Sequence, residues 1–155
     1  MVEGALLRIK EVEMKALIAE SNCEESDNIV MAFNLCLPNF ELITADTGKQ
    51  CLDMVKNNSL DMVILGDLAD MSGIDAIEKI RADSEVPVMV LSNIDDELLV
   101  VKAFDLGVDG YMTKPFHQLE LIARVRVILR RRDGRLITRL KNGGLKRSGY
   151  ARTRK

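Results

Sequence analysis

The stretch Leu60-Asp61-Met62-Val63-Ile64-Leu65-Gly66-Asp67-Leu68-Ala69-Asp70-Met71-Ser72-Gly73 decides the fold. Four apolar residues, 62–65, run without a polar break, which is typical of a strand buried on both faces in a parallel sheet. A loop with two carboxylates, Asp67 and Asp70, follows, and a helical pattern begins after Ser72-Gly73. Ligands of open α/β sheets collect where the carboxyl ends of strands meet such loops, so we expect this loop at the functional edge.

The same alternation of strand and helix runs through most of the chain. Buried strands are predicted over residues 14–19, 40–45, 62–65, 87–91 and 111–113, and an apolar pattern with helical spacing follows each of them. These elements predict one α/β domain with a doubly wound, five-stranded parallel sheet in the flavodoxin-like order 2-1-3-4-5.

Two further helical features lie at the ends of the domain. A short extra helix is expected over residues 4–13. The fifth helix is expected to end near Arg131–Arg132, because Asp133-Gly134 is a typical helix-stop and turn signal.

Length and composition bound the possible functions. A chain of 155 residues fits one domain with a tail, and 47% hydrophobic residues suffice for a core. No apolar run approaches the roughly 18 residues of a membrane span, and no secretion signal begins the chain, so no membrane contact is expected. The cysteines Cys23, Cys36 and Cys51 lack metal-type spacing and indicate reduced thiols in a cytoplasm. His117 is the only histidine, which disfavours a histidine-based metal site or catalytic triad.

The charge is distributed unevenly. Residues 130–155 hold eleven of the 22 basic residues and one acid, Asp133, whereas 23 of the 24 acids lie elsewhere. The chain is therefore divided into an amino-terminal extension (1–13), an acidic domain (14–131) and a basic tail or truncated linker (132–155). Such a tail suits phosphate backbones without base readout, which makes DNA a candidate partner. A solvated tail and a tail folded onto the acidic body are the alternatives.

Three segments carry a resemblance to a known family, namely residues 61–73, 88–92 and 107–116. They resemble the receiver domain of response regulators in two-component signalling, over roughly residues 14–131. The sequence GVDGYMTKPF at 107–116 is the most specific of the three. The predicted fifth helix, with ELIARVRVILRR at 120–131, is similar to the OmpR/PhoB subfamily of transcription factors.

The resemblance implies roles for particular residues. In that family, two acids after the first strand and an aspartate that ends the third strand bind Mg²⁺, and this aspartate accepts a phosphoryl group from a sensor histidine kinase. By position, the family's two phosphate contacts correspond to Ser92 and Lys114, and the aromatic residue that changes rotamer with the signalling state corresponds to Tyr111. The resemblance implies a signalling domain and not an enzyme.

The acid cluster departs from the family pattern. Glu20 and Ser21 stand where the family has two acids, so a single carboxylate is left. The acceptor position falls on Gly66 when counted from the start of the third strand and on Leu65 when counted back from the end of the loop, so Asp67 fits neither count. Mg²⁺ is held mainly by carboxylates and glycine carries no nucleophile. We therefore expect a degenerate phospho-acceptor region and no cofactor, with Mg²⁺ bound only if the site is still competent.

Four of these residues have alternative interpretations. Asp67 is either a displaced acceptor or a loop acid that caps nearby backbone groups, and the second is favoured. Glu20 is either a residual cation ligand or a partly buried acid paired with Lys114. Ser92 is either a phosphate contact or a cap of the following helix, and Tyr111 is either a switch residue or an ordinary core aromatic.

We therefore expect an atypical OmpR/PhoB-like receiver that regulates transcription or signalling through dimerisation and protein contacts, without Mg-dependent aspartyl phosphorylation. The resemblance implies a homodimer through the fourth helix, fifth strand and fifth helix, where Asp105 and Arg126 are placed to pair while Glu120 and Arg124 lack charged partners. Ordinary solvated helix charges are the alternative. Two other functions stay open: a conventional phospho-acceptor that uses Asp67, and a nucleic-acid-binding regulator whose receiver only dimerises.

Overall fold

The computed structural model describes residues 13–142, and the side chains of its last helix as far as Arg132. The helix expected over residues 4–13 lies almost wholly outside the described residues, as does the end of the basic tail from residue 143 onward.

A single parallel sheet organises the described residues. Its five strands are β1 (Met14–Ala19), β2 (Phe40–Ala45), β3 (Met62–Leu65), β4 (Val88–Ser92) and β5 (Gly110–Thr113), and their order in the sheet is β2-β1-β3-β4-β5. All four residues of β3 and all five of β4 are buried, as expected for central strands covered on both faces. The predicted fold class and strand order are confirmed.

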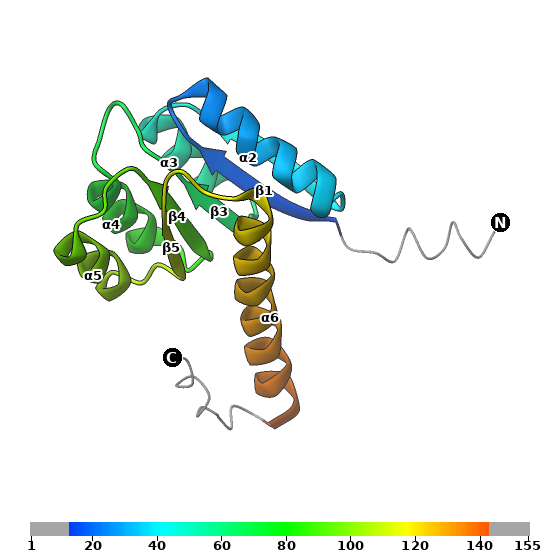
Figure 1. The fold of residues 1–155 in the computed structure, drawn as a ribbon. Helices are drawn as coiled ribbons and strands as arrows, with labels where there is room; N and C mark the ends of the chain where they lie inside the picture. Colours follow the sequence, from blue (N-terminus) through cyan, green and yellow to red (C-terminus); the bar gives the residue numbers. More distant parts are fainter. Residues whose placement is uncertain (1–12, 143–155) are drawn as a thin grey trace.

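Five helices cover the two faces of the sheet (Figure 1). They are α2 (Cys23–Cys36), α3 (Gly48–Asn57), α4 (Gly73–Asp83), α5 (Glu97–Asp105) and α6 (Gln118–Asn142). On one face Ile18, Ile64 and Leu91 pack with residues of α2 and α6, and on the other Leu17, Leu65 and Val90 pack with residues of α3, α4 and α5. Neighbouring residues of a strand point to opposite faces, so each central strand contributes to both cores.

The helices begin at polar caps that the loops supply. The side chains of Asn22, Thr47, Ser72 and Asp96 accept hydrogen bonds from backbone N–H groups in the first turns of α2, α3, α4 and α5. Gly107 follows α5 with a φ of 106°, a left-handed conformation that glycine adopts without strain. The four N-terminal caps fix where each helix begins after its strand at the carboxyl edge of the sheet.

The predicted end of the last helix is wrong. We expected a stop at Asp133-Gly134, but α6 continues through both residues to Asn142 (Figure 1). A glycine inside a helix costs only about 1 kcal/mol relative to alanine, and the flanking arginines and leucines are strong helix formers. Arg132 also anchors the helix to the body, since its Nη1 donates to the carbonyl and carboxylate oxygens of Asp61 at 3.1 and 3.0 Å.

Within the described residues no helix is long and apolar enough to cross a membrane. The three cysteines are free thiols, with Cys23 exposed, Cys36 intermediate and Cys51 buried. Burial, with a smaller contribution from the charge of Asp70, raises the pKa of the Cys51 thiol to about 11. Cys51 is therefore a protonated core residue at neutral pH.

Candidate functional site

Polar side chains from four strand ends meet at the carboxyl edge of the sheet. Glu20 follows β1, Asp67 lies two residues after β3, Ser92 ends β4 and Lys114 follows β5. The parallel pairing of these strands brings their ends side by side. The structure therefore gathers four of the predicted site residues in one place, and hydrogen bonds join them.

Lys114 is the centre of this cluster. Its Nζ lies 2.8 Å from Oε1 of Glu20 and 3.1 Å from Oδ2 of Asp67. The Lys114 and Glu20 side chains are 3% and 1% exposed, whereas that of Asp67 is 34% exposed. A buried ammonium group is tolerated only when it is paired and hydrogen-bonded. Of the two interpretations of Glu20, the structure shows the ion pair with Lys114, and Glu20 is more deeply buried than we expected.

Gly66 leaves the space that Glu20 fills. Its N–H donates to the carbonyl of Ala19 at 2.7 Å, so Gly66 extends the pairing of β3 with β1 by one residue. A Cβ atom on Gly66 would overlap Oε1 of Glu20 and would lie 2.9 Å from its Cδ. Gly66 thus stands at the end of the strand, and the Glu20 carboxylate lies where a side chain on this residue would begin.

The remaining acceptor capacity of Glu20 is also used. Its Oε1 accepts a second bond from the N–H of Asp67 at 3.1 Å, and its Oε2 accepts from the N–H of Asn22 at 3.0 Å. Glu20 therefore ties the β1–α2 loop to the β3–α4 loop in addition to neutralising Lys114.

The Asp67 carboxylate is surrounded by donors. Oδ1 accepts from the hydroxyl of Ser92 at 2.7 Å, and Oδ2 accepts from the backbone N–H and side-chain amide of Asn93, both at 3.0 Å, and from Lys114. One of the four donors bonds to Oδ1 and the other three share Oδ2, so Oδ2 is crowded with donors and Oδ1 keeps acceptor capacity. Asp67 is thus neither a freely solvated acid nor only a backbone cap, and no sequence signal pointed to the two bonds from Asn93.

These contacts shift the pKa values of both charged partners. Partial burial alone would raise the pKa of Asp67, but the bonds from Ser92, Asn93 and Lys114 outweigh it and hold this pKa below the usual 3.8. Burial alone would lower the pKa of Lys114, but its bonds to Glu20 and Asp67 outweigh it and raise the pKa above 10.5. Both groups are therefore charged over the whole neutral range.

Ser21 joins two loops instead of carrying a charge. Its hydroxyl donates to the carbonyl of Asp46 at 2.6 Å and accepts from the N–H of Ala69 at 2.8 Å. Its backbone N–H donates to the carbonyl of Asp67 at 3.0 Å. The residue at the second acid position therefore joins the β1–α2 loop to the β2–α3 and β3–α4 loops.

The second loop carboxylate, Asp70, lies outside the cluster. It accepts from the N–H groups of Gly48 and Lys49 at 2.7 and 3.2 Å and so caps α3 from another loop. The bond from Gly48, the larger of these contributions, and that from Lys49 lower the pKa of Asp70. The neighbouring Met71 side chain lies over Gly48, where a Cβ would meet it at 2.6 Å. Asp70 and Met71 therefore fasten the β3–α4 loop to α3.

Ser92 links Asp67 to the start of α5. Its Oγ accepts from the N–H of Ile94 at 3.0 Å, and the carbonyl of Ile94 accepts from the hydroxyl of Tyr111 at 2.9 Å. The helix-capping alternative for Ser92 is wrong, because Asp96 is the cap of α5 and accepts from Leu98 at 2.9 Å. The Tyr111 ring packs against one core while its hydroxyl bonds to the β4–α5 segment.

The donor set does not fit Mg²⁺, the ion that the resemblance implies. Mg²⁺ needs near-ideal octahedral oxygen coordination. Here the oxygens of Glu20 and Asp67 already accept from protein donors, Ser21 adds no charge, and Lys114 neutralises one of the two carboxylates. No group of three or more His, Cys, Asp or Glu among the described residues is placed to hold a metal ion.

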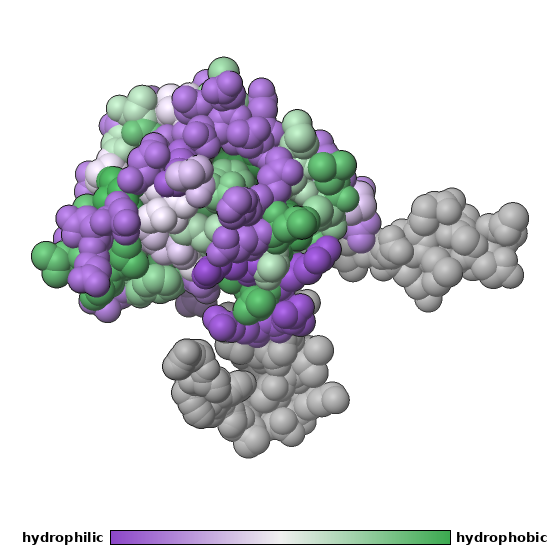
Figure 2. Space-filling model, viewed as in Figure 1, coloured by the Kyte–Doolittle hydropathy of each residue, from purple (hydrophilic) through white to green (hydrophobic). Residues whose placement is uncertain are grey.

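The residues predicted for a dimer surface lie on α5 and α6 and are exposed. Glu120 and Arg124 form an ion pair within α6 at 3.4 Å, and Arg126 donates to the carbonyl of Cys36 at the end of α2 at 3.3 Å. A feature that no sequence signal had pointed to is a set of exposed apolar side chains that begins before α5 and continues along it: Ile94 (44% exposed), Leu98 (79%), Val101 (55%) and Phe104 (47%). At the left of Figure 2, where Figure 1 labels α5, hydrophobic residues in green lie among hydrophilic ones in purple.

The fold and the cluster define a receiver domain. Residues 17–126, well over half of the chain, match the response regulator receiver domain family. The chain therefore belongs to this family, and the predicted resemblance to receiver domains is confirmed.

Relatives of known function agree with this assignment. The cell cycle transcriptional regulator CtrA of Caulobacter vibrioides is 35% identical over 134 residues, which are 85% of this chain and 57% of CtrA. The sensory transduction protein RegX3 of Mycolicibacterium smegmatis is 39% identical over 109 residues, 70% of this chain and 48% of RegX3. The receiver domain of Francisella response regulator 1452 superposes with a TM-score of 0.70 at 27% identity, covering 76% of this chain and 98% of that domain.

The chain spans about half the length of the curated relatives that it matches. The relatives include transcriptional regulators by name, which supports the predicted similarity to the OmpR/PhoB subfamily. Residues 17–126 of this chain are the receiver domain of a two-component response regulator.

The charges of Asp67 and Lys114 predict how stability depends on pH. Because the folded pKa of Asp67 is depressed, its contribution is complete above its unfolded pKa near 3.8 and is lost as the pH falls through the lower folded value. Because the folded pKa of Lys114 is raised, its contribution is complete below 10.5 and is lost as the pH rises through the higher folded value. Urea unfolding of wild type and Asp67→Asn should differ by a constant free energy between about pH 5 and 9, and by less below pH 4. A difference that grows on acidification would contradict the ion-pair assignment.

Proposed function

We propose that this chain is an atypical receiver domain that regulates a partner or effector through protein contacts, without Mg-dependent phosphorylation of an aspartate. The observation that supports this best is the pairing of Lys114 with Glu20 and Asp67 beside a glycine at the end of β3. Gly66 carries no carboxylate to attack a phosphoryl donor, and the Glu20 carboxylate fills the adjoining space.

Asp67 is poorly prepared to act as a replacement acceptor. Phosphoryl transfer depends on a positioned nucleophile and on neutralisation of the charge that develops on the phosphoryl oxygens. All four donors at Asp67 already bond to its carboxylate, and Lys114 is shared with Glu20. An attack by Oδ2 would require the loss of its bonds to Asn93 and Lys114, and an attack by Oδ1 would compete with the bond from the Ser92 hydroxyl.

The second prediction concerns covalent phosphorylation. Wild-type protein incubated with acetyl phosphate and Mg²⁺ should show no added phosphoryl group by intact mass spectrometry. Asp67→Asn should give the same result, which makes it the matched control for adventitious labelling. A single phosphoryl adduct on wild type that is absent from Asp67→Asn would establish Asp67 as a conventional acceptor and would refute this proposal.

We further propose that the domain forms a homodimer through α5, β5 and α6. The support is the exposed apolar row Ile94, Leu98, Val101 and Phe104, with Asp105 at the end of the same helix. Contiguous exposed apolar side chains typically mark interaction surfaces, and two-fold homodimers are the commonest closed assemblies.

The three free cysteines of the protein suit a reducing compartment, so we place this protein in the cytoplasm.

The third prediction tests this dimer. Leu98→Glu should lower the dimer fraction at least tenfold in sedimentation, because it places a charge in the apolar row without touching the monomer core. Met31→Glu is the matched control, since Met31 is 51% exposed on α2, on the opposite face of the sheet from α5. It also lies more than one helical turn from Cys36, to which Arg126 donates. Arg126→Glu should also weaken the dimer, and adding Asp105→Arg should partly restore it. A wild type that stays monomeric at high micromolar concentration would rule out the dimer.

A second candidate function is binding of nucleic acid by the basic end of the chain. It is favoured by the continuation of α6, which carries Arg135, Arg139 and Lys141 beyond the acidic body instead of turning back at Gly134 (Figure 1). Residues 133–155 hold eight basic residues and one acid. Phosphate contacts of this kind supply sequence-independent affinity.

The fourth prediction separates this segment from the body. Wild type should bind duplex DNA of any sequence, and the logarithm of its binding constant should fall with the logarithm of salt concentration by about 0.9 for each phosphate contacted. A chain ending at Arg132 keeps the bonds of this residue to Asp61, so its thermal midpoint should barely change while DNA binding is lost. Undiminished binding by the shortened chain would refute the role of the segment.

A further inference from the structure

A cavity of about 480 Å³ lies at the amino edge of the sheet, opposite the edge that holds the cluster around Lys114. Its lining comes from the segments that lead into β3, β4 and β5, and Arg132 of α6 completes it. Glu85 is the exposed acid in this lining. The apolar part of the wall is formed by Val55, Leu60, Val86 and Pro87.

The amino edge of the sheet favours positive charge. The helices α3, α4 and α5 all end at this edge, and the carbonyl groups at the end of a helix carry partial negative charge. Two guanidinium groups are already bound there. Arg81 donates to the carbonyls of Val86 and Gly107 at 2.7 to 3.2 Å. Arg132 donates to the carbonyl of Asp61 at 3.1 Å.

Two acids beside the cavity add negative charge that no cation of the body neutralises. Asp83 is the last residue of α4, Glu85 follows two residues later, and both are exposed. Within residues 13–132, whose side chains the structure describes, neither acid forms an ion pair. An acid at the end of a helix is unfavourable by itself, so a cation at this place is stabilised by the acids and by the helix end together.

We propose that this cavity is the docking site of the chain's own segment 143–155, through an arginine or lysine side chain that enters beside Glu85. The segment holds five basic residues and no acid, so its charge complements that of Asp83 and Glu85. The apolar wall suits the methylene stem of such a side chain, while the carboxylates receive its charged end. The contact lies at the amino edge and does not depend on the proposed function of the cluster at the carboxyl edge.

The length of the chain allows this contact. Arg132 lines the cavity, and α6 continues beyond it through residues 133–142, which correspond to about 15 Å of helix (Figure 1). Residues 143–152 can span roughly 33 Å when extended, about twice the distance back to the level of Arg132. Arg152 and the basic residues after it therefore reach the cavity.

Tethering makes a weak contact sufficient. Exposed ion pairs between free molecules are individually weak. A segment joined to the body by a short tether is present at an effective concentration in the millimolar range, so a dissociation constant in that range fills the cavity for about half of the time. The contact should therefore form within one chain and should weaken as salt screens the charges.

The experiment uses the full-length chain with a nitroxide spin label attached at Ser148→Cys. Cys23 and Cys36 are changed to alanine, whereas Cys51 is buried and protonated and stays unlabelled. At low salt the amide NMR signals of Ser59 and Glu85 should lose at least half of their intensity relative to the reduced, diamagnetic label. In about 1 M salt, where the Debye length is about 3 Å, they should recover.

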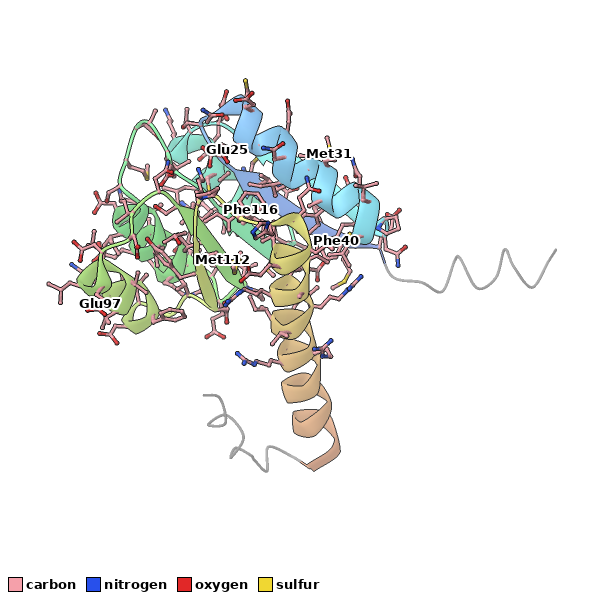
Figure 3. The ribbon with its side chains drawn as sticks, viewed as in Figure 1. Glu25, Met31, Phe40, Glu97, Met112 and Phe116 are labelled. Atoms are coloured by element: carbon pink, nitrogen blue, oxygen red, sulfur yellow. The ribbon has the colours of Figure 1, made fainter. Side chains whose placement is uncertain are left out.

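A pair of double variants tests the site. Asp83→Asn with Glu85→Gln should restore most of the lost intensity, and it should not weaken the fold, because it removes acids from the end of a helix. Glu24→Gln with Glu25→Gln is the matched control, since it removes the same charge at the start of α2. Figure 3 shows Glu25 at the top of the view and the end of α6 at the bottom. The control should keep the loss of intensity.

Three results would overturn the inference. Undiminished signals of Ser59 and Glu85 at low salt would show that the segment does not dock. An equal loss in both double variants would show that the acids beside the cavity do not hold it. Isotope-labelled chains without nitroxide, mixed with nitroxide-labelled chains, should lose no intensity, and a loss there would assign the contact to a second copy. No sample contains nucleic acid or a phosphoryl donor, so these results are independent of the second and fourth predictions.

Discussion

The buried ammonium of Lys114 is the constraint on which the rest of the site depends. Water cannot solvate a side chain that is 3% exposed, so the protein must supply its counter-charges, and it does so from β1 through Glu20 and from the β3–α4 loop through Asp67. Each of these acids also bonds to backbone N–H groups of other loops. The requirement to neutralise one cation therefore fixes the loops after β1, β3 and β4 relative to one another.

Asp67 lies one residue beyond Gly66 at the end of β3, and this single residue decides which groups surround its carboxylate. An acid on Gly66 would stand at the end of β3, beside β1, where Glu20 now lies. An acid one residue later has left the strand, and its carboxylate reaches the end of β4, where Ser92 and Asn93 donate to it. The same charge thus changes its neighbours from β1 to β4, because the backbone turns between the two positions.

The sequence predicted the fold well because hydrophobic periodicity and turn residues are local signals. β1, β2 and β3 have the bounds that were expected, and Gly66, on which the count from the start of the third strand placed the acceptor position, directly follows β3. The sequence could not show that Glu20 fills the space at Gly66, nor that Asn93 donates twice to Asp67, because these contacts depend on rotamers and on the path of a loop. The end of α6 was missed because a local stop signal was outweighed by the helix propensity of the residues around it.

A filled site changes how such a domain can be regulated. A ligand shifts a conformational equilibrium only by the difference between its affinities for the two states. Where the donors of Ser92, Asn93 and Lys114 are already satisfied by Asp67, an added anion gains little in either state, so it has little to shift. The exposed apolar row on α5 is a surface through which a partner protein could still act on this domain. Its first residue, Ile94, donates its N–H to Ser92 and accepts at its carbonyl from the Tyr111 hydroxyl. Because coupling between two sites is reciprocal, a protein that covers this row and moves Ile94 would also alter the bonds of Ser92 and, through them, the position of Asp67.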